Sequence, residues 1–434
     1  MNTLRGNQSD PDNKSADRLF RAGRFQQAEA LYAKTLAEDP GNRHAAIRLA
    51  AIALLCNRLT DVQAWSTRAI ELDSRTPTAR LGLHRFVSAL LRPKDASPQG
   101  LLGQAYYLGG NYRLAAPLLR AAGWKAQARK LKSFGDGEPY QIEGQAEVVR
   151  QAFIVTDPLP VVHVTINGGT PVNFFIDTGG AELIIDSEFA AESGVDLFDS
   201  ETGVFGGGKR ADYRNGRVDS VALGGMVVRN VPVSVMNVRR FSQPIFDGRR
   251  VDGIIGTFFL YQFLSTLDYA RGELVLRRKT AEHFARLEFE LREQNPVIVP
   301  FWMAEHCMLA WGTVNKIHPL LLFVDTGLAG MGFTCPKSTV DQAGLILQKH
   351  LAGEGLGGGG KVASIPLVVD HLALGNAGEE TIQGAFGPFP PQLENAFGFR
   401  IGGLISHQFF RPYALTIDFT GMRYFLTRQP GSGL

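Results

Sequence analysis

The sequence has few cysteines and no long apolar run. Three cysteines among 434 residues, Cys56, Cys307 and Cys335, are too few for a disulfide framework and odd in number. No uncharged apolar stretch reaches the roughly 18 residues of a membrane-spanning helix, and the polar N-terminus lacks the apolar region of a secretory signal. We therefore expect a cytoplasmic protein that does not enter a membrane.

The chain also lacks an excess of charge of either sign. Its 45 Lys and Arg face 42 Asp and Glu, which leaves a formal net charge of +3, and no block of basic residues stands out. This balance offers no electrostatic basis for binding nucleic acid. The hydrophobic content of 44% is that of a folded protein, and the length predicts about two to four domains.

The N-terminal part is Ala-rich with helical periodicity and repeats a short pattern. The pattern occurs at Gly23-x-Phe25, Asn57-x-Leu59 and Gly110-x-Tyr112. The first two copies are 34 residues apart, which is the period of tetratricopeptide helix pairs. This part therefore resembles a short, degenerate tetratricopeptide array that binds a protein partner. The alternative is an unrelated Ala-rich helical bundle.

Changes in composition divide the chain. From residue 151 onward, short β-branched runs are broken by Gly, Pro and Asn, which indicates mostly β structure. We expect five segments: a flexible N-terminus at 1–15, the helical module at 16–123, a linker at 124–150, and two β lobes at 151–285 and 286–434.

The β-rich part is written twice. Asp177-Thr-Gly is followed by FGGG, GIIG and TLDY, and Asp325-Thr-Gly is followed by LGGGG, GLIS and TIDF. The distance from the Gly of the third element to the Asp of the fourth is 15 residues in both copies. Landmarks in the same order and at the same spacing predict two homologous lobes.

This duplicated pattern resembles the pepsin-like and retropepsin-like aspartic proteases over about residues 140 to 430. Each lobe of that family carries a hydrophobic-hydrophobic-Asp-Thr-Gly turn and a later hydrophobic-hydrophobic-Gly strand. The resemblance implies an all-β, two-lobed, single-chain protease without a metal or cofactor, whose catalytic residues are Asp177 and Asp325. It also implies a set of supporting residues around the pair: Thr178, Gly179, Thr326 and Gly327.

The chemistry of paired carboxyls leads to the same function. Two carboxyls a few Å apart cannot both ionise easily, so they share a proton. One can then act as general base on a water molecule while the other acts as general acid on a peptide carbonyl. We therefore expect an aspartic-type endopeptidase, a hydrolase that acts on peptides or proteins, and a monomer suffices because both Asp residues lie in one chain.

Three positions around the turns differ from the pepsin-like pattern. Gly180 and Leu328 stand where pepsin-like enzymes have Ser or Thr after Asp-Thr-Gly, which is closer to the retropepsins. Loss of that hydroxyl is expected to raise the lower pKa of the pair and to move activity toward neutral pH. Ser406 stands where the first lobe has Gly256, which raises a question about packing in the second lobe.

A flap over the substrate is expected after the first Asp. The family places a β-hairpin there, often with a Tyr, and this stretch is rich in glycine. The expected flap residues are Phe205, Gly206, Gly207, Gly208 and Tyr213. Tyr213 has the alternative of being an ordinary strand residue.

Other motifs have weaker interpretations. The run GEGLGGGGKV resembles a phosphate loop, but Val362 follows the Lys where Ser or Thr is needed, and no strand-loop-helix context surrounds it. Glu305, His306, Cys307 and His318 lack metal-ligand spacing. Two alternative functions remain open: acid/base chemistry on a small molecule, and a non-catalytic scaffold.

Overall fold

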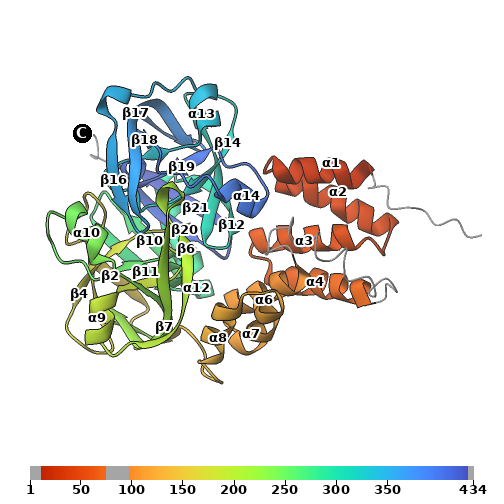
Figure 1. Cartoon of the computed structure of the whole chain (residues 1–434), viewed down its shortest axis with the longest axis horizontal. Helices are drawn as coiled ribbons and strands as arrows, with labels where there is room; N and C mark the ends of the chain where they lie inside the picture. Colours follow the sequence, from red (N-terminus) through yellow and green to blue (C-terminus); the bar gives the residue numbers. More distant parts are fainter. Residues whose placement is uncertain (1–10, 75–96, 429–434) are drawn as a thin grey trace, which may run out of the picture. The chain divides into compact units, whose positions relative to one another are not determined.

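The computed structural model describes residues 11–74 and 97–428, which form two compact units (Figure 1). The helical unit holds the chain up to Lys132 together with Leu393–Arg400. The β unit holds Ser133–Gln392 and the chain from Ile401 onward. The fold class predicted from the sequence, a helical-repeat module followed by a two-lobed β domain, is confirmed.

Most described helices of the helical unit follow one another in the N-terminal part of the chain, and α14 comes from the C-terminal part. They are α1 (Pro11–Arg21), α2 (Phe25–Glu38), α3 (Arg43–Leu55), α4 (Leu59–Ser74), α6 (Pro98–Leu108), α7 (Tyr112–Ala121), α8 (Lys125–Lys132) and α14 (Leu393–Phe397).

Each copy of the repeated pattern forms the turn between two helices. Gly23, Asn57 and Gly110 have positive φ angles of 74°, 54° and 74°, a backbone region that Gly and Asn tolerate best. The large residue two positions later is the first residue of the next helix, α2, α4 or α7. The pattern is therefore the helix-turn-helix signal that the 34-residue period predicted.

The segment Leu393–Arg400 belongs to the helical unit although it is far from it in sequence. Phe399 is buried, and its ring packs edge-on against those of Phe20 and Phe25, with centroids 5.9 and 5.0 Å apart. The expected second lobe, 286–434, includes this segment, so the structure differs from the expectation there. A contact between distant aromatic residues leaves no signature in the local sequence.

Two other expected boundaries shift for local reasons. The expected flexible N-terminus, 1–15, lies outside the described residues as far as residue 10, but α1 already begins at Pro11. Proline in the first turn and Asp12 beside the helix N-terminus both favour a helix start. The expected boundary between lobes, 285/286, falls inside helix α12 (Ala281–Gln294).

The expected linker, 124–150, contains regular structure. It holds helix α8, the short strand β1 (Gln141–Glu143) and the start of β2 (Val148–Ala152). Strand β1 pairs with β8, and β2 pairs with β11. These pairings join residues far apart in sequence, which is why composition alone indicates a linker.

The two lobes of the β unit repeat one order of strands. The first lobe contains β3 (Val161–Ile166), β4 (Val172–Ile176), β5 (Leu183–Asp186), β6 (Asp196–Val204), β7 (Arg210–Leu223), β8 (Met226–Met236), β9 (Gly253–Ile255), β10 (Phe263–Asp268) and β11 (Glu273–Arg278). The second contains β12 (Val297–Ala304), β13 (Cys307–Val314), β14 (Leu320–Val324), β15 (Phe333–Thr334), β16 (Gly353–Gly357), β17 (Gly360–Leu374), β18 (Ala377–Phe386), β19 (Gly403–Ile405), β20 (Tyr413–Asp418) and β21 (Arg423–Arg428).

Short helices connect these strands. In the β unit they are α9 (Ser187–Glu192), α10 (Arg239–Ile245), α11 (Thr257–Leu260), α12, α13 (Lys337–Gln342) and α15 (His407–Phe410). Helix α11 follows β9 in the first lobe, and α15 follows β19 in the second, so the helices repeat as well.

Strands from both lobes form one continuous sheet. Within the described residues its order runs β16-β17-β18-β15-β19-β14-β13-β12-β21-β20-β10-β11-β2, and the remaining strands form a sheet in the order β1-β8-β5-β9-β4-β3-β7-β6. The lobes join where β10 pairs with β20, and Thr266 faces Thr416 in that register. Their buried hydroxyls are 2.8 Å apart. An approximate two-fold axis therefore passes between these two threonines.

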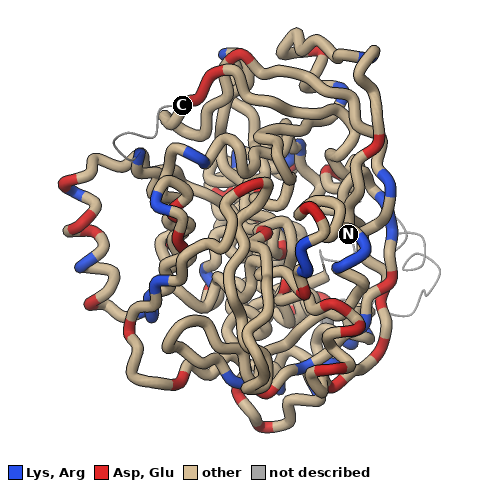
Figure 2. The backbone as a smooth tube through the Cα atoms, turned by 90° about the vertical axis from the view of Figure 1, so that its left-hand side faces the viewer, with Lys and Arg blue, Asp and Glu red and all other residues tan. Residues whose placement is uncertain are grey.

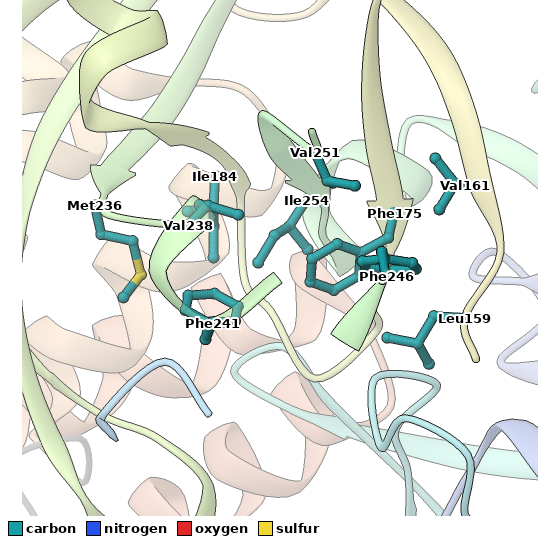
Figure 3. Packing of buried hydrophobic residues seen from close by; sticks show 10 residues of the cluster. All are labelled: Leu159, Val161, Phe175, Ile184, Met236, Val238, Phe241, Phe246, Val251 and Ile254. Atoms are coloured by element: carbon teal, nitrogen blue, oxygen red, sulfur yellow. The ribbon is translucent and has the colours of Figure 1, made fainter. Parts of the chain in front are cut away.

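A cluster of buried apolar side chains fills the first lobe behind strand β4 (Figure 3). Phe175 and Phe246 lie side by side in it, with ring centroids 5.7 Å apart. This packing supports β4, the strand that directly precedes Asp177.

Charged residues of both signs are distributed along the backbone without gathering by sign (Figure 2). In the part of the chain that the structure describes, none of the helices has the length and apolar character needed to cross a membrane.

Candidate active site

The two Asp-Thr-Gly turns meet between the lobes of the β unit. Asp177 directly follows β4, and Asp325 directly follows β14. Each Asp-bearing strand runs parallel to the short strand of the hydrophobic-hydrophobic-Gly element, β9 or β19. The ladder extends to the acids themselves, because the Asp177 N–H donates to the Ile255 carbonyl at 3.1 Å and the Asp325 N–H to the Ile405 carbonyl at 3.0 Å. The parallel strands thus fix where each carboxyl leaves the sheet.

The two threonines hold the turns together. The Thr178 N–H donates to Thr326 Oγ1 at 3.1 Å, and the Thr326 N–H donates to Thr178 Oγ1 at 3.0 Å. Thr178 Oγ1 in turn donates to the Val324 carbonyl at 3.0 Å. Both side chains are fully buried. Since buried hydrogen bonds of this kind are costly to lose, the interlock sets the distance between the lobes.

The glycines bring each turn against the opposite acid. A Cβ on Gly179 would overlap the carboxyl of Asp325, and a Cβ on Gly327 would overlap that of Asp177. The Gly179 N–H donates to Asp177 Oδ1 at 2.7 Å, and the Gly327 N–H donates to Asp325 Oδ1 at 2.8 Å. Only glycine permits this approach while also offering an amide to the carboxylate.

The two carboxyls are hydrogen-bonded to each other and differ in acidity. Burial and the negative charge of Asp177 raise the pKa of Asp325 well above its usual value. Burial also raises the pKa of Asp177, but hydrogen bonds from Asp325, Gly179 and Gly180 oppose that rise. The pair therefore binds one proton tightly, and the pKa of Asp325 is the more strongly raised of the two.

The positions after the two turns are held differently in the two lobes. The Leu328 N–H donates to Ser406 Oγ at 3.1 Å, and Ser406 is fully buried. The first lobe has Gly256 at the matching position, where a Cβ would overlap the backbone carbonyl of Glu182. The substitution noted in the sequence thus adds a hydrogen bond to the second lobe without disturbing its packing.

The expected flap is a hairpin of β6 and β7. Its tip is a single 3-10 turn at Gly206–Gly208, which follows Phe205. The Gly207 N–H donates to the Pro388 carbonyl at 2.6 Å. The Phe205 ring lies against Gly358, at the tip of the hairpin of β16 and β17 in the second lobe. Both lobes therefore contribute a glycine-rich hairpin, and the two tips are in contact.

Tyr213 lies on β7 opposite Glu201 of β6. Its hydroxyl donates to Glu201 Oε2 at 3.4 Å, and burial together with the charge of Glu201 raises the pKa of the tyrosine. Tyr213, Phe205 and Ala211 pack against the buried cluster of the first lobe, together with Leu356 and Ala329 of the second lobe. Tyr213 is therefore a strand residue whose packing attaches the flap hairpin to the core of the first lobe.

One residue beside the turns was not predicted from the sequence. His306 lies in the tight turn between β12 and β13 of the second lobe, and its Nε2 is 3.0 Å from the carbonyl oxygen of Gly179 in the first lobe. The sequence predicts only that this histidine belongs to a strand or turn of the second lobe and is not a metal ligand. Nothing in the local pattern indicates a contact across the lobes.

The two cysteines of the second lobe are buried. Burial raises the pKa of the Cys335 thiol to about 12 and that of Cys307 well above its usual value, so neither is a ready nucleophile. Among the described residues, no group of three or more His, Cys, Asp or Glu side chains could hold a metal ion.

Two parts of the chain are similar to known protein families. Residues 162–259 match the family model "Aspartyl protease", and residues 19–80 match the model "Tetratricopeptide repeat". Among solved structures, a retropepsin-like aspartic protease from Rickettsia conorii is 18% identical over 32% of this chain and 94% of its own, with a TM-score of 0.21. A search of curated proteins finds no match. The resemblance predicted from the sequence, an aspartic protease with an N-terminal tetratricopeptide-like region, is confirmed.

Proposed function

We propose that the chain is an aspartic-type endopeptidase that hydrolyses peptide bonds with a water molecule activated by Asp177 and Asp325. The observation that carries the proposal is the hydrogen-bonded carboxyl pair, in which each acid accepts a glycine amide of its own turn. A pair arranged in this way can hold one proton and one negative charge, which is the state needed for general acid and general base catalysis together.

The proposed reaction conserves protons at the pair. Asp177 takes a proton from water, whose oxygen bonds to the peptide carbonyl carbon, while Asp325 gives its proton to the carbonyl oxygen. The tetrahedral intermediate then returns a proton to Asp325, and the proton on Asp177 passes to the leaving nitrogen as the C–N bond breaks. Neither step requires a metal or a cofactor.

The hairpins suggest how the substrate is held. An extended peptide between the carboxyl pair and the two hairpin tips would make main-chain hydrogen bonds as an added strand does. The hairpins would have to separate to admit it, which glycine-rich tips allow. The tetratricopeptide-like helices would bind a protein partner or a segment of the substrate. We propose further that the enzyme works as a monomer in the cytoplasm, at a pH closer to neutral than the pepsin-like enzymes.

The test is cleavage of a diverse peptide library, read by mass spectrometry between about pH 4 and 8, where one carboxyl of such a pair is ionised. The wild type is compared with Asp177→Asn and Asp325→Asn, and with Asp341→Asn as a control on an exposed acid. We expect each change in the pair to lower the cleavage rate by about 10³-fold or more, and the control to cleave normally.

Two outcomes would contradict the proposal. Cleavage that survives either change in the pair would show that other groups do the chemistry. Absence of cleavage by the wild type over the whole pH range would leave the small-molecule enzyme or the scaffold as the better interpretation, and binding of a transition-state-mimicking inhibitor would favour the former.

A further inference from the structure

The peptide bond between Gly179 and Gly180 lies in the first catalytic turn and is flanked by glycine on both sides. Such a bond can rotate easily, because neither neighbour has a Cβ to restrict it. Its orientation affects the site: the Gly180 N–H donates to the Asp177 backbone carbonyl at 3.1 Å and also faces the Asp177 carboxyl. In a rotated bond the carbonyl oxygen would face the carboxyl instead and would disfavour its ionised form.

In the second catalytic turn, groups of the same lobe fix the orientation of the matching peptide bond. The matching peptide bond joins Gly327 to Leu328, whose side chain restricts rotation, and the Leu328 N–H is held by Ser406 Oγ. The first lobe has Gly256 in place of this serine and therefore no side chain that could accept the Gly180 N–H in the same way.

In the first turn, a side chain of the second lobe, His306, fixes the matching peptide bond through its carbonyl. The Gly179 carbonyl can only accept, so His306 Nε2 carries the hydrogen and donates it across 3.0 Å. The next two carbonyls are held within the first lobe, Gly180 by the Thr257 N–H and Ala181 by the Phe258 N–H. His306 thus holds the one carbonyl of this peptide bond, whereas Ser406 holds the N–H of its counterpart.

The imidazole of His306 is itself fixed. Its ring lies edge-on to that of Phe258 with centroids 6.4 Å apart, and Cys307 Sγ is 3.7 Å from Nε2. Burial lowers the pKa of His306 to about 4, so the ring is neutral in the pH range where the carboxyl pair works. The titratable groups around it are Glu305 and Cys307 on its own hairpin and the carboxyl pair beyond Gly179.

We propose that His306 is a positioning residue that holds the Gly179–Gly180 peptide bond in the orientation in which the Gly180 amide faces Asp177. This inference deepens the proposed function and rests on it. It assigns a role in the first lobe's site to a side chain of the second lobe, so the site is complete only when the lobes are joined.

The experiment compares His306→Leu, which removes the donor, with His306→Gln, whose amide can restore it. His318→Leu serves as the control, since His318 is an exposed histidine of the same lobe. For His306→Leu we expect kcat to fall about tenfold with KM little changed, and the acidic limb of the pH profile to move to higher pH. His306→Gln is expected to recover most of both, and the control is expected to match the wild type.

A second measurement does not depend on cleavage. Carboxyl carbon NMR of the free protein follows the titration of Asp177 and Asp325 directly. We expect the first proton of the pair to be lost at higher pH in His306→Leu than in the wild type. If the wild type cleaves no peptide, the proposed function fails, while this titration still decides the role of His306.

The inference is overturned if folded His306→Leu keeps the wild-type carboxyl titration and the wild-type acidic limb. Should His306→Leu fail to fold, His306→Asn replaces it, because that amide keeps a polar side chain but is too short to reach the Gly179 carbonyl. A wild-type titration in His306→Asn would overturn the inference in the same way.

Discussion

At the residue scale, two copies of one tripeptide differ in acidity because their surroundings differ. Burial raises the pKa of both carboxyls and glycine amides oppose the rise at both, but the negative charge of Asp177 raises the pKa of Asp325 further. A near-symmetric pair can thus share one proton unequally without any change in the motif itself.

The raised pKa of Asp325 predicts a cost in stability. A carboxyl whose pKa is higher in the folded state binds its proton more tightly there than in the unfolded chain, so the free energy of unfolding falls as pH rises through its range. We expect Asp325→Asn, which cannot ionise, to raise the melting temperature at pH 7 while abolishing activity.

Thermal unfolding of this variant and the wild type, followed between about pH 4 and 8 where the pair titrates, checks the prediction. The difference in melting temperature should grow toward high pH, and Asp341→Asn should show no such trend. A difference that is constant with pH would mean that the effect does not come from the ionisation of Asp325.

At the element scale, the paired hairpins are the feature that matters most. A glycine is required at the flap tip because Gly207 has a φ of 64° and a Cβ there would overlap the side chain of Val362 on β17. Gly358 of the other hairpin likewise leaves room for the ring of Phe205. The hairpin tips therefore pack closely, because the glycines of each tip leave room for a side chain of the other hairpin.

Replacement of this glycine tests the hairpin contact. We expect Gly207→Ala to lower kcat/KM by about tenfold, because the tips can no longer close together. The matched control is Gly168→Ala in the turn between β3 and β4, where φ is 70° but no atom lies within 4 Å of the added Cβ.

Both substitutions force alanine into a left-handed backbone, which costs each variant about 1 kcal/mol of stability, and Gly207→Ala adds the cost of the overlap with Val362. Urea unfolding and peptide cleavage, measured on the same preparations, separate this shared cost from the loss of activity. Equal activity in the two variants would show that the hairpin tips do not have to meet.

At the scale of the whole molecule, the helical and β units have separate cores. Ala115 is fully buried on α7, so its site leaves no exposed space for a larger side chain. We expect Ala115→Leu to destabilise the helical unit by about 1–3 kcal/mol through overpacking, and the β unit to keep its unfolding transition.

Circular dichroism during thermal unfolding measures the helical transition, with Ala121→Leu on the exposed side of α7 as the control. Short peptides should still be cleaved at the wild-type rate, since they need only the β unit. Loss of short-peptide cleavage in Ala115→Leu would contradict the prediction that this cleavage needs only the β unit.

The sequence by itself determined the parts of the protein that depend on local pattern and spacing. These are the helix pairs with their Gly and Asn turns, the duplicated β lobe, and the two acids of the Asp-Thr-Gly turns. The acids could be predicted because an Asp-Thr-Gly turn after an apolar strand is formed by a few neighbouring residues. The glycine-rich tip of the first hairpin is likewise evident from the sequence.

The tertiary structure decided what depends on residues far apart in the chain. The pairing of Thr266 with Thr416, the strands inside the expected linker and the packing of Phe399 on the N-terminal helices follow from contacts that no local pattern encodes. His306 is the clearest case: its neighbours in sequence suggest only a turn, and its position beside Gly179 arises when the second lobe meets the first.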